Sequence, residues 1–127
     1  MRHIQITYIT DDDVHQDTAG KMAINCGAAI HGRHPARVPA EGCWSDAVLY
    51  DLDAVEPDHR PALLSRILSE KRGCPTAIHG YALSDEQAEK LRRHRIAVAK
   101  RLSPELFHDL CEAARYALGS RTRRLIE

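Results

Sequence analysis

Short apolar segments alternate with segments of helical periodicity over most of the chain. Ile4, Ile6 and Tyr8 alternate with polar residues, and this period of two predicts a strand over residues 4–10. Three later runs are almost wholly apolar and are bounded by charged or turn-forming residues, which is typical of strands buried on both faces. These runs cover residues 46–51, 75–79 and 96–99.

Helical periodicity fills the intervals between these strands. Apolar positions recur every fourth residue over residues 14–31, which predicts a helix there. Ser84 and Gln87 have the spacing of a capping box, so a helix is expected to begin after Ser84. Two further helices are predicted near Pro61 and Pro104, because proline is favoured in the first turn of a helix.

Residues 32–45 carry the weakest signal of secondary structure. Pro35 and Pro39 exclude a continuing helix, and the residues around Arg37 and Val38 are compatible with a short strand. Little chain then remains before the next strand, so the helix at this point is predicted to be shortened to a loop.

The order of the elements predicts the class of fold. Strands that alternate with helices over short links imply parallel strands joined by right-handed crossovers, with helices on both faces of the sheet. A chain of 127 residues is long enough for one hydrophobic core. The sequence therefore predicts a single α/β domain over residues 1–127, a doubly wound (βα)5 arrangement with a shortened second helix.

Composition narrows the classes of partner. The chain has 18 basic and 18 acidic residues, so neither a nucleic-acid partner nor an anionic membrane is expected. Its first residues lack the apolar segment of a signal peptide, and no apolar run is long enough to cross a bilayer. The four cysteines are scattered, so neither a zinc site nor a disulfide scaffold is predicted, and a cytoplasmic location is expected.

Charged residues follow three of the predicted strands. Asp11 and Asp12 follow the first strand, Asp51 ends the strand of residues 46–51, and Lys100 follows the last. The carboxyl ends of parallel strands meet at one edge of the sheet, where ligands bind. Carboxylates held close together need a cation, and a hard divalent ion such as Mg²⁺ takes oxygen ligands. The ammonium group of Lys100 is suited to the negative charge of a transferred phosphoryl group.

These residues resemble the receiver domains of two-component response regulators. Residues 46–52 (DAVLYDL) are similar to the segment of that family that carries the phosphoacceptor aspartate. The acidic run at residues 11–13, the turn at residues 80–81 and Lys100 follow the family in order and spacing. The resemblance covers about residues 4–118. It implies a CheY-like, three-layer sandwich with the sheet order 2-1-3-4-5.

The resemblance also implies a role for each residue at the strand ends. Asp51 would accept a phosphoryl group from a histidine kinase or a phosphotransfer protein. Asp11, Asp12, Asp51 and the backbone carbonyl of Asp53 would hold Mg²⁺, and Lys100 would contact the phosphoryl oxygens. The implied function is that of a signalling module rather than an enzyme.

Some positions depart from the family pattern. His79 occupies the position of the threonine or serine whose hydroxyl contacts the phosphoryl group, and Ala97 occupies the position of the aromatic residue that reports the switch. Arg101 replaces the proline that commonly follows the lysine. These changes affect the relay of the signal and leave the acceptor and the lysine in place.

The sequence is therefore compatible with three functions. The first is a stand-alone receiver, in which no effector domain is expected after residue 127 and an unknown downstream protein, or a second copy in a homodimer, is expected to receive the signal. The second is a pseudo-receiver, a docking or dimerisation module that is not phosphorylated. The third is a small flavodoxin-like enzyme or ligand-binding domain that uses the carboxylates for metal-assisted chemistry.

Overall fold

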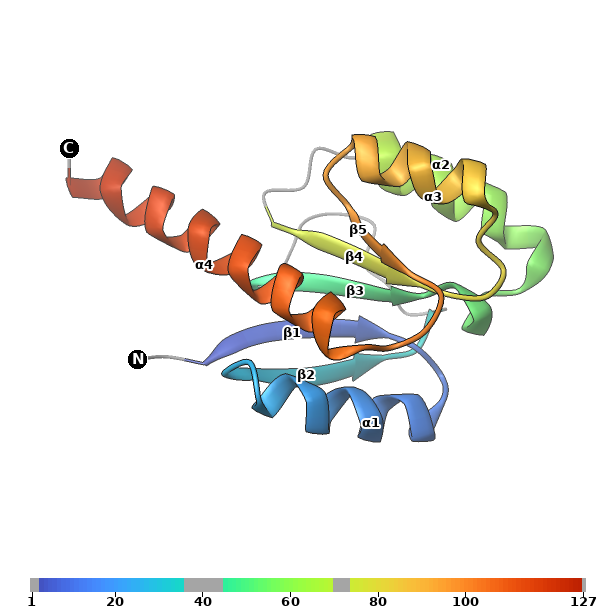
Figure 1. Cartoon of the computed structure of the whole chain (residues 1–127), viewed down its shortest axis with the longest axis horizontal. Coiled ribbons are helices and arrows are strands. Elements are labelled where there is room, and N and C mark those ends of the chain that lie inside the picture. The colour runs from blue at the N-terminus through green and yellow to red at the C-terminus, as the bar shows by residue number, and fades with distance from the viewer. Residues whose placement is uncertain (1–2, 36–44, 70–73, 127) are drawn as a thin grey trace.

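A five-stranded parallel sheet forms the centre of the computed structural model, which describes residues 3–35, 45–69 and 74–126 (Figure 1). The strands are β1 (Ile4–Ile9), β2 (Ala28–Arg33), β3 (Ala47–Asp51), β4 (Thr76–His79) and β5 (Ala97–Ala99), and the helices are α1 (Asp13–Ile24), α2 (Arg60–Ser69), α3 (Asp85–Arg93) and α4 (Pro104–Ile126). The strand order is β2-β1-β3-β4-β5, as the resemblance implies.

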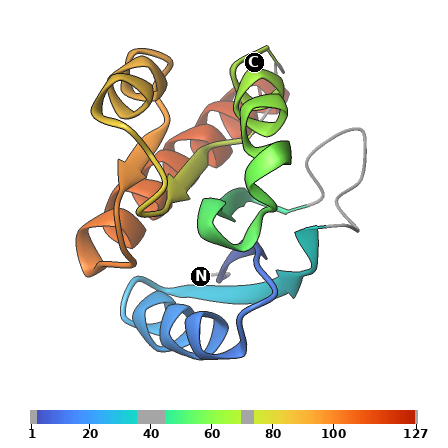
Figure 2. The same cartoon turned by 90° about the vertical axis from the view of Figure 1, so that its right-hand side faces the viewer.

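The helices cover the two faces of the sheet in pairs (Figure 2). On one face, Ala23 of α1 packs in the same apolar cluster as Phe107 and Leu110 of α4. On the other face, Leu64 of α2 and Leu91 of α3 belong to a second cluster. Because strands with apolar side chains on both faces need cover on both, these pairs of helices produce the predicted three-layer sandwich.

The first helix is shorter than its periodicity predicts. Helix α1 ends at Ile24, and residues 28–31 belong to the edge strand β2, so the predicted helix over residues 14–31 is wrong in its last third. Gly27 has a φ of +71°, a left-handed conformation that glycine adopts without strain and that ends the helix. Cys26 and Ile30 continue the four-residue spacing only by coincidence, because the chain between them reverses direction.

Most other predicted elements agree with the structure within a few residues. Ser84 and Gln87 form both hydrogen bonds of the predicted capping box at the start of α3. The predicted strand near Arg37 and Val38 and the shortened helix fall on residues 36–44, which lie outside the described residues.

The expectation about cysteines is only partly correct. Cys26 and Cys111 are free thiols, but Cys74 is disulfide-bonded, which the scattered spacing of the cysteines did not predict. Among the residues that the structure describes, no helix is long and apolar enough to cross a membrane.

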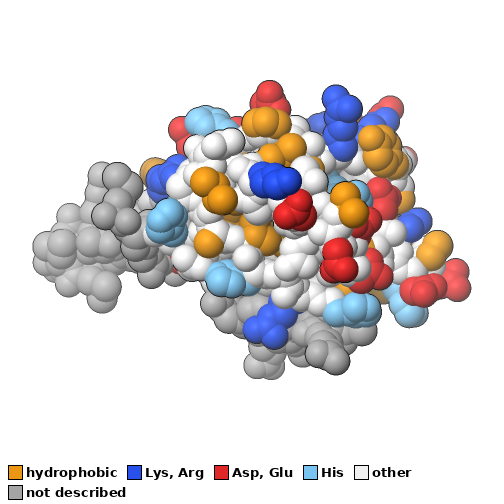
Figure 3. Space-filling model, turned by 90° about the horizontal axis from the view of Figure 1, so that it is seen from below, with side chains coloured by type: hydrophobic (Ala, Val, Ile, Leu, Met, Phe, Trp, Pro, Cys, Tyr) orange, Lys and Arg blue, Asp and Glu red, His pale blue; other side chains and the backbone are white. Residues whose placement is uncertain are grey.

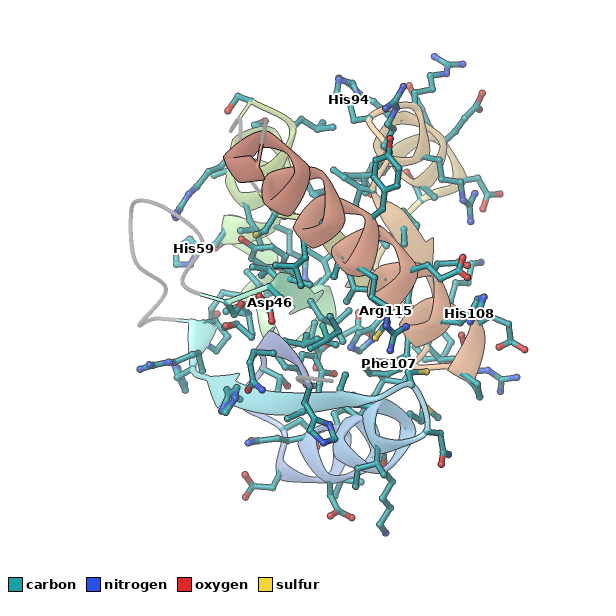
Figure 4. The ribbon with its side chains drawn as sticks, turned by 90° about the vertical axis from the view of Figure 1, so that its left-hand side faces the viewer. Asp46, His59, His94, Phe107, His108 and Arg115 are labelled. Carbon is teal, nitrogen blue, oxygen red and sulfur yellow. The ribbon has the colours of Figure 1, made fainter. Side chains whose placement is uncertain are left out.

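Phe107 gives a test of how the sheet and α4 depend on each other. Its side chain is fully buried in the cluster that joins α4 to β1 and α1, and it lies on the side of α4 that faces the sheet (Figure 4). Phe107→Ala is expected to lower the free energy of unfolding by about 3–5 kcal/mol, because the cavity adds to the lost burial. Urea denaturation measures this loss. Tyr116→Ala on the same helix is the control, since Tyr116 is 78% exposed, and an equal effect of both substitutions would contradict the packing.

Candidate functional site

The carboxyl ends of the strands meet at one edge of the sheet, which faces the viewer in Figure 2. Asp51 is the last residue of β3 and is only 1% exposed. On one side it pairs in register with His79 of β4, and on the other side Thr10 directly follows β1. Seen from the side of α1, acidic side chains gather towards this end of the molecule (Figure 3).

The two oxygens of the Asp51 carboxylate have different surroundings. Oδ2 accepts a hydrogen bond of 2.9 Å from the Thr10 hydroxyl and lies 2.9 Å from Nδ1 of His15. Oδ1 is buried and has no hydrogen-bond partner among the described residues. Buried polar atoms without partners are rare in folded proteins, and they often mark a functional site or the place of a water or an ion.

His15 reaches Asp51 because the start of α1 is fixed. Asp12 is the N-cap of this helix, and its Oδ1 accepts hydrogen bonds from the backbone N–H groups of Val14 and His15, at 2.9 and 3.0 Å. The imidazole of His15 lies 3.6 Å from the other oxygen of Asp12 and therefore bridges Asp12 and Asp51.

The charge of His15 follows from these contacts. The hydrogen bond to Asp51 raises the pKa of His15 above its ordinary value, and its partial burial opposes this shift. The backbone hydrogen bond from His15 holds the pKa of Asp12 below its ordinary value. Together these contacts favour a cationic imidazole between two carboxylates.

His79 lies on the other side of the carboxylate, in a drier environment. Its side chain is 3% exposed, and its Nε2 atom is 3.9 Å from Oδ1 of Asp51. The same nitrogen shares a hydrogen bond of 2.5 Å with the hydroxyl of Tyr8. Burial lowers the pKa of His79, although the charge of Asp51 opposes this shift, and burial also raises the pKa of Tyr8. His79 is therefore held as a neutral imidazole, whose ring nitrogen is engaged by Tyr8.

Asp53 is engaged in structural contacts. Its carboxylate accepts hydrogen bonds of 2.9 and 3.0 Å from the backbone N–H groups of Tyr81 and Ala82. These bonds connect the loop after β4 to the loop after β3. Gly80 permits this approach, because a Cβ atom there would lie 3.2 Å from Oδ1 of Asp53. The backbone carbonyl of Asp53, predicted to be a metal ligand, lies 3.4 Å from an N–H donor of Arg60.

Asp11 and Lys100 lie at the same edge without joining the contacts of Asp51. Asp11 is exposed and lines a cavity of about 520 Å³ beside β1 and α2. Lys100 follows β5 and is also exposed. Within the part of the chain that the structure describes, no ion pair or hydrogen bond joins either side chain to Asp51.

The predicted magnesium ligands do not form a metal site as they are placed. Mg²⁺ requires several oxygen ligands at about 2.0–2.1 Å in an octahedral arrangement. Asp12 caps a helix, the carbonyl of Asp53 faces Arg60, and one oxygen of Asp51 is bonded to Thr10 and His15. No group of three or more acidic, histidine or cysteine side chains in the described ranges is arranged to hold a metal ion.

The sequence reasoning missed three residues of this site. Thr10 could have been found from the strand pairing, because the residue after β1 must lie beside the end of β3. His15 is in the first turn of α1, directly above the strand ends, but its direction depends on the cap at Asp12. Tyr8 carries no signal in the sequence, since its alternation with polar residues is that of any strand residue.

Comparisons with known proteins bear on the fold. No protein-family model matches the sequence, and no curated protein is similar to it at a significant level. A CheY-like response regulator receiver domain protein from Methanospirillum hungatei JF-1 has a similar structure, with 13% identity and a TM-score of 0.65 over 93% of this chain and 98% of that one. The chemotaxis response regulator CheY4 of Vibrio cholerae has 11% identity and a TM-score of 0.56, over 88% and 98% of the two chains.

A third similar structure is a fusion that carries the trimeric coiled coil of yeast Spc42, with 17% identity and a TM-score of 0.64 over 100% of this chain and 86% of that one. At such identities the likeness shows the fold alone. The expected CheY-like receiver fold is thereby confirmed, whereas the roles predicted for Asp51, Lys100 and the acidic residues stay predictions.

The contact between His15 and Asp51 makes stability depend on pH. Because the pKa of His15 is raised above 6.5 in the folded chain, the protonated pair stabilises the fold fully below that value. This stabilisation is lost as the pH rises through the folded-state pKa. His15→Ala is therefore expected to cost about 1 kcal/mol at about pH 5.5 and clearly less at about pH 9, since His15 is partly exposed.

Urea denaturation at the two pH values measures the difference between wild type and variant. Thr10→Val is the matched control, because it removes the other hydrogen bond to Oδ2 and carries no titratable group. Its cost is expected to be similar at both pH values. A cost of His15→Ala that stayed constant or grew with pH would contradict a cationic His15.

Proposed function

We propose that the chain is a receiver-type signalling domain in which Asp51 accepts a phosphoryl group from the phosphohistidine of a histidine kinase or a phosphotransfer protein. The receiver fold supports this proposal, because Asp51 ends the middle strand at the edge where such folds bind ligands. The observation that carries it is the buried Oδ1 atom of Asp51, which has no partner in the described part of the chain. A nucleophilic oxygen must keep a lone pair available for bond formation.

The transfer would form one bond and break another. An oxygen of Asp51 forms the new bond to phosphorus, the phosphorus–nitrogen bond of the donor breaks, and its electron pair returns to the donor imidazole, which takes up a proton. The product is an acyl phosphate. The imidazole of His15 lies 2.9 Å from Asp51 and would offset the negative charge that gathers there.

Magnesium is the cofactor that the resemblance implies, but the residues that would hold it do not fit the ion as they are placed. Its chemistry would be to neutralise charge on the phosphoryl oxygens. Asp51 and Asp12 are the side chains that would have to turn towards it. Because their oxygens are engaged with Thr10, His15 and the helix N-terminus, no step of the transfer is assigned to the ion.

Partners and location belong to the same proposal. The domain would act through contacts with a downstream protein or a second copy of itself, as a signalling module rather than an enzyme. A cytoplasmic location fits a phosphohistidine donor. The disulfide bond of Cys74 argues against a cytoplasmic location, since disulfide bonds are typical of oxidising compartments.

A docking module that is not phosphorylated is the second candidate function. The observation that favours it is that the polar groups around Asp51 have structural partners: Asp12 caps α1, and His79 shares its hydrogen bond with Tyr8. In this case Asp51 would be a buried acid retained for the fold, with His15 as its counter-ion.

Phosphorylation by a small donor separates the two functions. Phosphoramidate contains the same phosphorus–nitrogen bond as phosphohistidine, so wild type is expected to gain the mass of one phosphoryl group, with and without magnesium present. Asp51→Asn is expected to gain none, because an amide oxygen is a poor nucleophile. Intact-protein mass spectrometry and peptide mapping measure the result.

Asp46→Asn is the matched control. Asp46 precedes β3 at its opposite end, where its carboxylate accepts a hydrogen bond of 2.8 Å from the backbone of Gln5 (Figure 4). This variant should be phosphorylated as well as wild type. A wild type that gained no phosphoryl group under either condition would favour the docking module.

A further inference from the structure

His15 lies where a cation is expected at this edge of the sheet. Its Nδ1 atom is 2.9 Å from Oδ2 of Asp51 and 3.6 Å from Oδ2 of Asp12. These are two of the side chains that were predicted to share a divalent ion. The imidazole is held there by the helix itself, because the carboxylate of Asp12 bonds the backbone N–H of His15.

The lone pairs of the two carboxylates can be counted. Each carboxylate oxygen has two acceptor sites. Oδ2 of Asp51 uses both, for the Thr10 hydroxyl and for His15. Oδ1 of Asp12 uses both for the backbone N–H groups of Val14 and His15.

The two remaining oxygens, Oδ1 of Asp51 and Oδ2 of Asp12, have different surroundings. Oδ1 of Asp51 is buried beside His79, whose Nε2 atom is 3.9 Å away, whereas Oδ2 of Asp12 belongs to a carboxylate that is 43% exposed and faces the ring of His15. A single ion would need both oxygens within about 2.1 Å. The imidazole of His15 lies 2.9 Å from Asp51 and 3.6 Å from Asp12, and so fills space that an ion shared by the two carboxylates would need.

We propose that the imidazole of His15, which lies against both Asp51 and Asp12, occupies the place of a divalent cation and keeps such ions from the site. His15 is thus a positioning residue: its side chain must leave before Asp51 and Asp12 can share an ion. This inference goes beyond the proposed function, because it holds whether or not Asp51 is phosphorylated.

The consequence is a gain of affinity when His15 is removed. In His15→Ala, the acceptor site of Oδ2 of Asp51 that His15 occupies becomes open to an ion, and Oδ2 of Asp12 no longer faces the imidazole. We expect Mg²⁺ to bind this variant about tenfold more tightly than wild type, or better. If His15 only supported the local structure, His15→Ala would not bind Mg²⁺ more tightly, because disruption of the strand-end site would lower its affinity for the ion.

Magnesium titration followed by amide NMR spectra tests the inference. In His15→Ala, saturable shifts are expected at residues near the strand ends, around Asp12 and Asp51, and wild type should show only weak shifts there. His15→Asn is the second variant, because its neutral side chain is polar and shorter. It should also bind more tightly than wild type and serves if His15→Ala does not fold, which the dispersion of the spectra shows directly.

Two further variants complete the design. His94→Ala is the matched control: His94 is exposed beyond the end of α3, and its ring nitrogen contacts the carbonyl of Lys90 (Figure 4). It should bind Mg²⁺ as weakly as wild type. The double variant His15→Ala with Asp51→Asn should lose the gained affinity, which places the ion at Asp51.

The outcomes are distinct from those of the phosphorylation experiment. Equal or weaker magnesium affinity in both His15 variants would overturn the inference, and so would tight, saturable binding by wild type. Neither result depends on phosphoramidate. Conversely, a wild type that is not phosphorylated would contradict the proposed function and leave the gain of affinity in His15→Ala unaffected.

Discussion

The burial of the Asp51 side chain is the constraint on which the strand-end site depends. Asp51 is 1% exposed at the end of the middle strand, and a carboxylate in such a position is costly unless it is paired and hydrogen-bonded. Thr10, which directly follows β1, and His15 of α1 supply the hydrogen bonds. The start of α1 is in turn fixed by Asp12. The N-cap of this helix therefore also positions His15, which contacts the buried carboxylate of Asp51.

Two imidazoles lie next to this carboxylate and differ in character. His15 is half-exposed, and its hydrogen bond to Asp51 favours the cation, whereas His79 is buried and burial favours its neutral form. Two cations against one carboxylate would leave an uncompensated buried charge. The hydrogen bond to Tyr8 gives the neutral ring a partner instead. The site thereby pairs the carboxylate of Asp51 with His15 and satisfies its second imidazole by a neutral contact.

The fold could be predicted from the sequence because its signals are local and agree with one another. Apolar runs such as residues 46–51 bounded by charge, and the capping box at Ser84, each indicate one element, and their alternation leaves few topologies. The edge strand β2 could not be predicted in the same way. This strand is less buried than the central strands, so its residues are not uniformly apolar. The four-residue spacing of apolar positions in α1 also continues past Gly27 into the strand. Only the backbone conformation at Gly27 separates the two elements.

The candidate site could be predicted in position but not in its contacts. Topology brings the ends of β1, β3 and β5 to one edge, so Asp51, Asp11 and Lys100 were placed there correctly as positions in the fold. Which oxygen accepts which hydrogen bond is a matter of ångströms, and it depends on the direction of side chains such as Thr10 and His15. A spacing that matches acidic residues to a metal site assumes that their lone pairs are available. Here the helix N-terminus already uses one oxygen of Asp12, and Thr10 and His15 use one oxygen of Asp51, so only part of each carboxylate is left for a cation.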